Sequence, residues 1–216
     1  PNNAGARIFV DISELVHRDS KTGIQRVTRS ILKELLENPP TGFEIVPVYA
    51  TMATKGYFAA RNFLSRFSGK NPQHSVPDEA IDFYPEDIFL GLDFHPHVVC
   101  AQKNALDAMH LAGVKVLFVV YDLLCVQMPQ HFVEGTVQGF GQWLDTIAAY
   151  DGALCISKSV ADDLSGYMQR AHPARSKYFV IGGFHIGADI ESSNPTRGLP
   201  TNATQTLQSL QARPIL

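Results

Sequence analysis

Residues 7–36 read RIFVDISELVHRDSKTGIQRVTRSILKELL, and this stretch decides the fold. Residues 8–12 are apolar and partly β-branched, which predicts a buried strand near the N-terminus. A polar loop follows. Apolar residues then recur at the spacing of an amphipathic helix, at Ile24, Val27, Ile31 and Leu35. The stretch therefore predicts a strand, a loop and a helix in that order.

The turn between loop and helix is Thr22-Gly23-Ile24-Gln25-Arg26. Thr22 and Gln25 have the spacing of a capping box, so the helix is expected to begin at Gly23. A helix start exposes unpaired backbone N–H groups and the positive end of the helix dipole, which favours phosphate. Gly23 lets a ligand approach the backbone, and Arg26 offers a bidentate donor. The alternative is an ordinary capped helix that binds nothing.

The rest of the chain alternates between strand-like and helix-like segments. Strands are predicted at residues 43–50, 87–91, 114–121, 153–156, 178–181 and 184–186. Helices are predicted at residues 55–70, 101–111, 135–149 and 157–170, the last with Ser159 and Asp162 in capping-box spacing. This alternation predicts an α/β fold with a Rossmann-like, doubly wound, mainly parallel sheet.

Composition narrows the class of protein. A chain of 216 residues fits one large domain, and its net charge of -3 does not indicate a polyanionic partner such as nucleic acid. No signal peptide is expected, and the most hydrophobic run, residues 114–126, is too short to span a bilayer. The three cysteines, Cys100, Cys125 and Cys155, are expected to be reduced in a cytoplasmic protein. The first residue is Pro1, so a processed or excised chain is expected.

Basic residues are interspersed in residues 55–70, where Phe63, Leu64 and Phe67 share one helical face. One interpretation is a helix that covers the sheet and turns its basic side to solvent. The other is an amphipathic element that touches an anionic membrane surface or a lipid-linked substrate.

Ligands of doubly wound sheets bind at the carboxyl ends of the strands. Asp122 follows a fully apolar strand, where a carboxylate is costly to bury without partners, so a functional role is favoured. His131 is either a surface or a site histidine, and Ser157 is explained by helix capping alone. His185 is either a core histidine or a donor in a cleft. The strand-end candidates are Asp11, Asp93, His95, Asp122, Ser157, His185 and Asp189.

Five blocks of sequence, taken together, resemble the N-terminal half of a family 4, GT-B type retaining glycosyltransferase. The similar branch includes mannosyltransferases of bacterial polysaccharide and O-antigen (lipopolysaccharide) assembly. The order and spacing of the blocks extend over nearly the whole chain, which is more specific than any one of them. The blocks are residues 10–15 (VDISEL), 22–27 (TGIQRV), 120–124 (VYDLL), 155–162 (CISKSVAD) and 184–189 (FHIGAD).

The resemblance implies two Rossmann-like domains that face a cleft. Residues 1–190 would be the acceptor-side domain, and residues 191–216 the interdomain linker and the start of the C-terminal donor domain. That donor domain and its E-x7-E motif are expected to be missing from this chain, so the chain alone is expected to be inactive.

The resemblance also implies roles for individual residues. Thr22, Gly23 and Arg26 would face the donor diphosphate, and Asp122 would be catalytic, beside the transferred sugar or the acceptor hydroxyl. The family usually has a proline where this chain has Cys125 and a His-Pro pair where it has Met128-Pro129, which leaves the role of His131 open. The acceptor or cleft-lining residues would be Asp11, His131, Ser157, His185 and Asp189.

The predicted function is transfer of a sugar, in one version mannose, from a nucleotide sugar to a polysaccharide or lipid-linked glycan with retention. The nucleotide sugar would be a substrate, with no cofactor and no essential metal. The protein would be cytoplasmic, with peripheral contact to the inner membrane through residues 55–70. The alternatives are a non-catalytic ligand-binding module and another nucleotide-dependent Rossmann-like enzyme. The absence of G-x-G-x-x-G after the first strand argues against the second.

Overall fold

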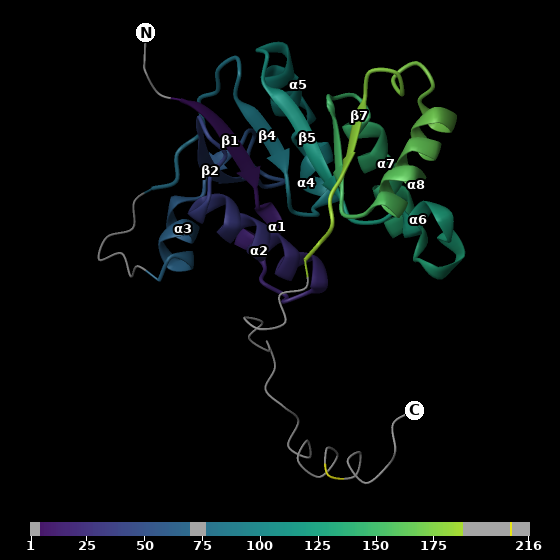
Figure 1. Ribbon diagram of the computed structural model, residues 1–216, viewed down its shortest axis with the longest axis horizontal. Coiled ribbons are helices and arrows are strands. Elements are labelled where there is room, and N and C mark those ends of the chain that lie inside the picture. Colours follow the sequence, from purple (N-terminus) through teal and green to yellow (C-terminus); the bar gives the residue numbers. More distant parts are fainter. Residues whose placement is uncertain (1–4, 70–76, 188–207, 209–216) are drawn as a thin grey trace. The chain divides into compact units, whose positions relative to one another are not determined.

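The fold is that of a seven-stranded sheet, seen in a computed structural model that describes residues 5–69, 77–187 and 208 (Figure 1). The strand order is β3-β2-β1-β4-β5-β6-β7, and every neighbouring pair is parallel except β2 and β3. The strands are β1 (Ala6–Asp11), β2 (Phe43–Tyr49), β3 (Phe58–Ala59), β4 (Ile88–Gly91), β5 (Lys115–Val120), β6 (Gly152–Cys155) and β7 (Val180–Gly183).

Helices cover both faces of the sheet (Figure 1). Helices α2 and α3 pack on one face, and α4, α5, α7 and α8 contribute to the core on the other. The helices are α1 (Ser13–His17), α2 (Gly23–Glu37), α3 (Arg61–Phe67), α4 (Pro96–Ala101), α5 (Lys103–Leu111), α6 (Leu124–Gln127), α7 (Glu134–Ile147) and α8 (Lys158–Ala171), with a 3₁₀ turn at Pro129–His131. Among the described residues, none of these helices has the length and apolar character needed to cross a membrane.

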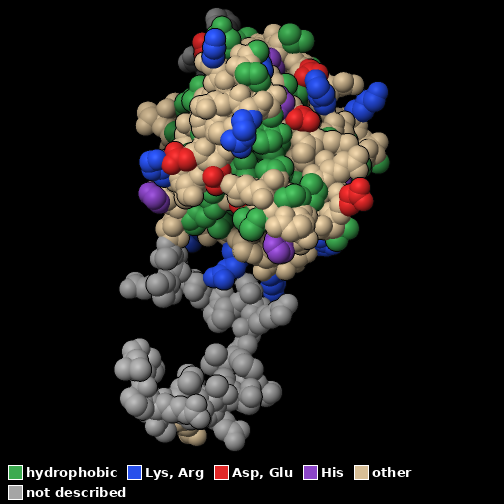
Figure 2. Space-filling model, turned by 90° about the vertical axis from the view of Figure 1, so that its right-hand side faces the viewer, with side chains coloured by type: hydrophobic (Ala, Val, Ile, Leu, Met, Phe, Trp, Pro, Cys, Tyr) green, Lys and Arg blue, Asp and Glu red, His purple; other side chains and the backbone are tan. Residues whose placement is uncertain are grey.

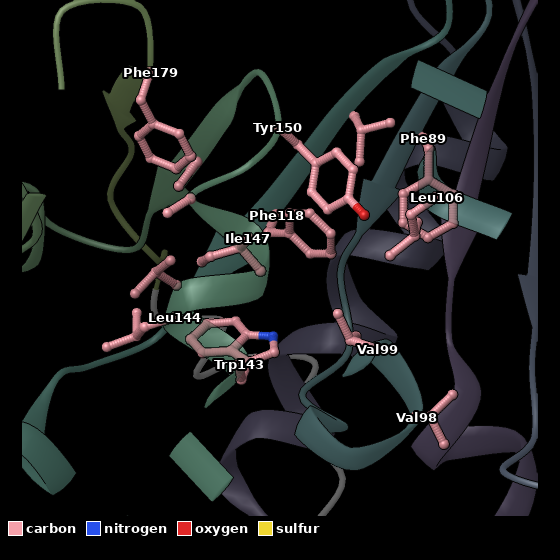
Figure 3. Packing of buried hydrophobic residues seen from close by; sticks show 14 of the residues in the cluster. Phe89, Val98, Val99, Leu106, Phe118, Trp143, Leu144, Ile147, Tyr150 and Phe179 are labelled. Atoms are coloured by element: carbon pink, nitrogen blue, oxygen red, sulfur yellow. The ribbon is translucent and has the colours of Figure 1, made fainter. Parts of the chain in front are cut away.

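Side chains of the central strands alternate between two cores. In β5, Phe118 faces the core with α5 and α7, while Val119 faces the core with α2 and α3. Figure 3 shows the first core, in which Trp143 and Ile147 of α7 lie near Phe118. Because each central strand is buried on both faces, its sequence is an almost unbroken apolar run. The predicted α/β, doubly wound, mainly parallel fold is therefore confirmed.

The predicted helix at residues 55–70 is wrong in its first half. Gly56 has a positive φ of 89°, Tyr57 is buried, and β3 pairs with β2 before α3 begins at Arg61. Tertiary pairing with β2 overrides the helical spacing in this segment. The apolar side of α3, with Phe63 and Phe67, packs into the core, so the interpretation as a helix covering the sheet describes the structure.

Four other local predictions are corrected. The predicted loop after β1 contains the short helix α1, and the predicted helix at residues 101–111 is divided between α4 and α5 at Gln102. The last strand ends at Gly183, so residues 184–186 do not continue it. Ser157, rather than Ser159, caps α8, since its hydroxyl oxygen accepts the N–H of Val160. Asp162 instead forms an ion pair with Lys158.

Residues up to Ile186 belong to one compact unit. The predicted boundary between residues 190 and 191 lies outside the described residues, so the division into domains stays a prediction.

Candidate functional site

A pocket of about 260 Å³ opens at the carboxyl end of β5. Its walls are mostly aromatic and aliphatic, and they come from the loops after β4 and β5, the first turn of α2, α6 and α7. The aromatic rings contact one another, with Phe94 edge-on to Trp143 at 5.3 Å between centroids. The lining residues are Ile24, Phe94, Tyr121, Asp122, Leu124, Cys125, Phe132, Thr136, Phe140 and Trp143.

Asp122 carries the only charge in this lining. Its Oδ1 accepts the N–H of Leu124 at 3.0 Å, which fixes the carboxylate at the start of α6. Within the described part of the chain, the other carboxylate oxygen has no hydrogen-bond partner. One fixed and one free oxygen beside an apolar wall suit a ligand with a hydroxyl group and a nonpolar face, such as a sugar ring.

The outer edge of the pocket is also apolar. Leu124, Met128 and Val133 are exposed in the segment from α6 to the start of α7. Figure 2 views the molecule from the side on which α6 and α8 lie, and hydrophobic side chains reach the surface there between charged ones. His131 lies in the 3₁₀ turn of this segment and is exposed, next to the pocket residue Phe132.

The start of α2 contributes one residue, Ile24, to the lining of this pocket. Its predicted capping box is present: the N–H of Gln25 donates to the Thr22 Oγ1, and the N–H of Thr22 donates to the Gln25 side chain. The N–H groups of Gly23 and Ile24 have no acceptor among the residues described, and the first turn of α2 has no acidic side chain. An anion bound at this helix start would meet free backbone N–H donors.

Two cationic side chains at this helix start, Lys21 and Arg26, have no carboxylate partner within the described ranges. By contrast, Arg18, Arg29 and Lys33 nearby each form an ion pair. Lys21 also has a φ of 54°, a left-handed conformation that is uncommon for a side chain with a Cβ. Lys21 is not among the site residues predicted from the sequence, because its backbone conformation and its lack of an ion pair are visible only in the tertiary structure.

Tyr121 joins α2 to the end of β5. Its hydroxyl donates to the Leu92 carbonyl at 2.9 Å and lies 3.2 Å from the buried Thr28 hydroxyl of α2. This bridge fixes α2 against the end of β5, one residue before Asp122. Asp122 lines the pocket, and of the first turn of α2 only Ile24 does, so Thr22, Gly23 and Arg26 lie next to a pocket residue in the chain but are not part of its lining.

Buried polar groups hold the loops at this edge of the sheet. The Asp11 carboxylate accepts the N–H of Ser13 at 2.9 Å and its hydroxyl at 2.5 Å, and Asp93 accepts the N–H of Leu15 at 2.7 Å. The Gln102 side chain bonds the loop after β2 through the Thr51 and Thr54 carbonyls and the Gly56 N–H. Asp11 is only 1% exposed, so it positions α1 and does not reach a cleft surface.

We expect these two acids to make stability depend on pH. Burial raises the pKa of Asp11 from 3.8 to about 7 and that of Asp93 to about 6. The folded state therefore binds more protons than the unfolded state between about pH 4 and pH 7, so both groups lower the free energy of unfolding as pH rises through that range. The slope is at most about 1.4 kcal/mol per pH unit for each group.

Urea unfolding at several pH values measures this effect. Asp11→Asn keeps an oxygen that accepts from Ser13, so its stability relative to the wild type should rise between pH 5 and pH 8. The exposed Asp162→Asn is the matched control and should not change the slope. An unchanged slope in Asp11→Asn would contradict the assignment.

Two further predicted residues, Ser157 and His185, lie elsewhere. Ser157 is half-buried and caps α8, and His185 is exposed beyond the end of β7. Asp189 lies outside the described residues. Neither Ser157 nor His185 lines the pocket beside Asp122. Across residues 5–69 and 77–187, no group of three or more His, Cys, Asp or Glu side chains is arranged to hold a metal ion.

Comparison with known proteins adds a sequence relationship. No protein-family model matches the chain. Three proteins similar to it are serotype-specific mannosyltransferases named WbdA from Escherichia coli, 35%, 35% and 34% identical over 96% of this chain. The chain spans about a quarter of their length. The predicted resemblance to a mannosyltransferase-like glycosyltransferase is therefore confirmed over nearly the whole chain.

Proposed function

We propose that this chain is the acceptor-side domain of a glycosyltransferase that moves a sugar, with mannose as the first candidate, from a nucleotide sugar to a glycan. One observation carries the proposal: Asp122 lines the same pocket as Ile24, which lies in the first turn of α2. A carboxylate beside a sugar-sized apolar pocket suits the acceptor hydroxyl, and free N–H groups with unpaired cations suit a diphosphate. The similarity to mannosyltransferases supports the same chemistry.

The finer parts of the proposal concern the reaction. The domain would be half of a GT-B fold of family 4, and transfer would retain the anomeric configuration. The leaving diphosphate would be stabilised by the start of α2, Lys21 and Arg26 without an essential metal. The nucleotide-sugar donor would be held mainly by a second domain across the pocket. The process served would be the assembly of a polysaccharide or O-antigen.

A transfer assay tests this function. The purified 216-residue chain, and a longer protein that joins it to a donor-binding domain, are each incubated with a glycan acceptor and a panel of nucleotide sugars. The longer protein should transfer one sugar with retention, and the chain alone should not. If the isolated chain transfers sugar, the expectation that it is inactive alone is wrong. If the longer protein transfers sugar from none of the donors, the proposed activity is wrong.

The proposed phosphate wall predicts a specific loss in the active protein. Arg26→Gln removes an exposed, unpaired cation at the start of α2, so the KM for the nucleotide sugar should rise about tenfold, as expected for a lost charge-assisted hydrogen bond. Lys33→Gln on the same helix is the control, because Lys33 already pairs with Glu37 at 3.9 Å. Equal KM values for the two variants would argue against a diphosphate at this helix start.

We also propose peripheral contact with an anionic membrane through residues 55–70. Because the apolar side of α3 is used in the core, the contact would rest on exposed cations such as Lys55 and Arg66. Flotation with vesicles containing anionic lipid checks this contact. Absence of binding at low salt would rule it out.

A further inference from the structure

A histidine–carboxylate pair lies where the strand order reverses direction. The sheet order places β1 beside β4, and the chain runs outward from this pair to both sides. In doubly wound sheets, ligands bind outside the carboxyl ends of the strands at this switch point. Glu14 of α1 follows β1, and His95 follows β4. His95 Nε2 lies 3.1 Å from Glu14 Oε2.

Both side chains of the pair are partly open to solvent, each 22% exposed. Burial lowers the pKa of His95, which favours the neutral ring at neutral pH. His17 packs edge-on to His95 with ring centroids 6.4 Å apart, and its Nε2 contacts the Ala50 carbonyl. The exposed Arg18 touches the other Glu14 oxygen at 3.3 Å.

Residues 93–95 connect this pair to the pocket. Asp93 points into the core and holds α1 through the N–H of Leu15. Phe94 points into the pocket beside Asp122, and His95 turns to Glu14. A ligand seated in the pocket therefore meets the pair next, if it extends from β5 toward β1 along the carboxyl edge.

We propose that Glu14 and His95 form a second subsite, which accepts the hydroxyl groups of a neutral oligosaccharide whose end occupies the pocket beside Asp122. The inference rests on the proposed function and adds where the acceptor chain runs. Glu14 supplies the acceptor oxygens, and His95 fixes the orientation of the carboxylate. Arg18 contributes only from the solvent side, since its side chain is 78% exposed.

Binding to the purified chain tests the subsite. The probes are α-mannotriose and methyl α-mannoside, titrated by saturation-transfer NMR against wild type, Glu14→Gln, His95→Gln and the control Arg18→Gln. Both subsite variants should raise the Kd for α-mannotriose about tenfold, because each removes or misorients a charged hydrogen-bond acceptor. Neither should change the Kd for methyl α-mannoside, and Arg18→Gln should change neither Kd by more than about twofold.

Each other result overturns the inference. Wild-type chain that fails to bind α-mannotriose, or subsite variants that bind it with wild-type affinity, would show that the pair holds no glycan. An equal loss for both probes would place the effect in the pocket or the fold, and thermal unfolding of each variant separates these two. The transfer assay is scored independently, so failure of the subsite and failure of the proposed activity give different results.

Discussion

Asp122→Asn is expected to lower the rate of sugar transfer by about 10²–10⁴-fold in the active protein that contains this chain. The reason is the free oxygen of its carboxylate, which lies at the apolar pocket next to the proposed diphosphate wall. The amide keeps an oxygen for the N–H of Leu124 but loses the negative charge. Transfer from the nucleotide sugar is measured at saturating donor and acceptor.

Two comparisons make this result specific. The free energy of unfolding should change by less than about 1 kcal/mol, because the partly exposed side chain keeps its local hydrogen bond. Asp162→Asn on α8 is the matched control, since Asp162 is exposed and its partner among the described residues is Lys158. It should retain wild-type activity. An Asp122→Asn protein with more than a third of the wild-type rate would remove Asp122 from the reaction.

Asp87→Ala should destabilise the fold by about 3–5 kcal/mol. Asp87 precedes β4 at the edge of the sheet opposite the pocket, and its side chain is 4% exposed. Its carboxylate accepts the backbone N–H of Arg7 at 2.9 Å, the guanidinium at 2.6 Å and the N–H of Tyr84 at 2.9 Å. Removing it leaves a largely buried guanidinium and two backbone donors without an acceptor. Urea denaturation measures the loss.

The control for the buried pair of Arg7 and Asp87 is an exposed arginine–carboxylate pair. Arg61 and Glu79 lie 2.9 Å apart, but both side chains are well exposed. Glu79→Ala should therefore cost less than about 1 kcal/mol. Equal effects of the two substitutions would show that burial does not set the value of the Asp87 contacts.

Much of the fold was predictable from the sequence because its signals are local. The apolar run of β5 marks a strand buried on both faces, and the spacing of Thr22 and Gln25 marks the start of α2. The errors fall where distant residues act. β3 forms because Phe58 pairs with Tyr49, and α4 ends where Gln102 turns inward to bond the loop after β2.

The candidate site was predictable only in part. Asp122, Thr22, Gly23 and Arg26 were predicted from strand ends and helix capping. The structure places Asp122 in one pocket with Ile24, the residue after Gly23, and the roles of these residues stay predictions. Lys21, Tyr121 and Glu14 were not identified, and His95 was a strand-end candidate whose contact with Glu14 was not foreseen. Lys21 needs its left-handed φ and its missing ion pair to be recognised, and Tyr121 needs its contact with Thr28, 93 residues away in the chain.

The sequence by itself determined the alternation of strands and helices, the capped start of α2, and the similarity to mannosyltransferases, because periodicity, capping and residue identity are properties of short segments. The tertiary structure alone decided which strand ends lie side by side. Asp93 holds Leu15 across 78 residues, and β1 adjoins β4 although β2 and β3 come between them in the chain. Hydrogen bonds of that range arise only when the sheet is assembled, so they carry no local signal in the sequence.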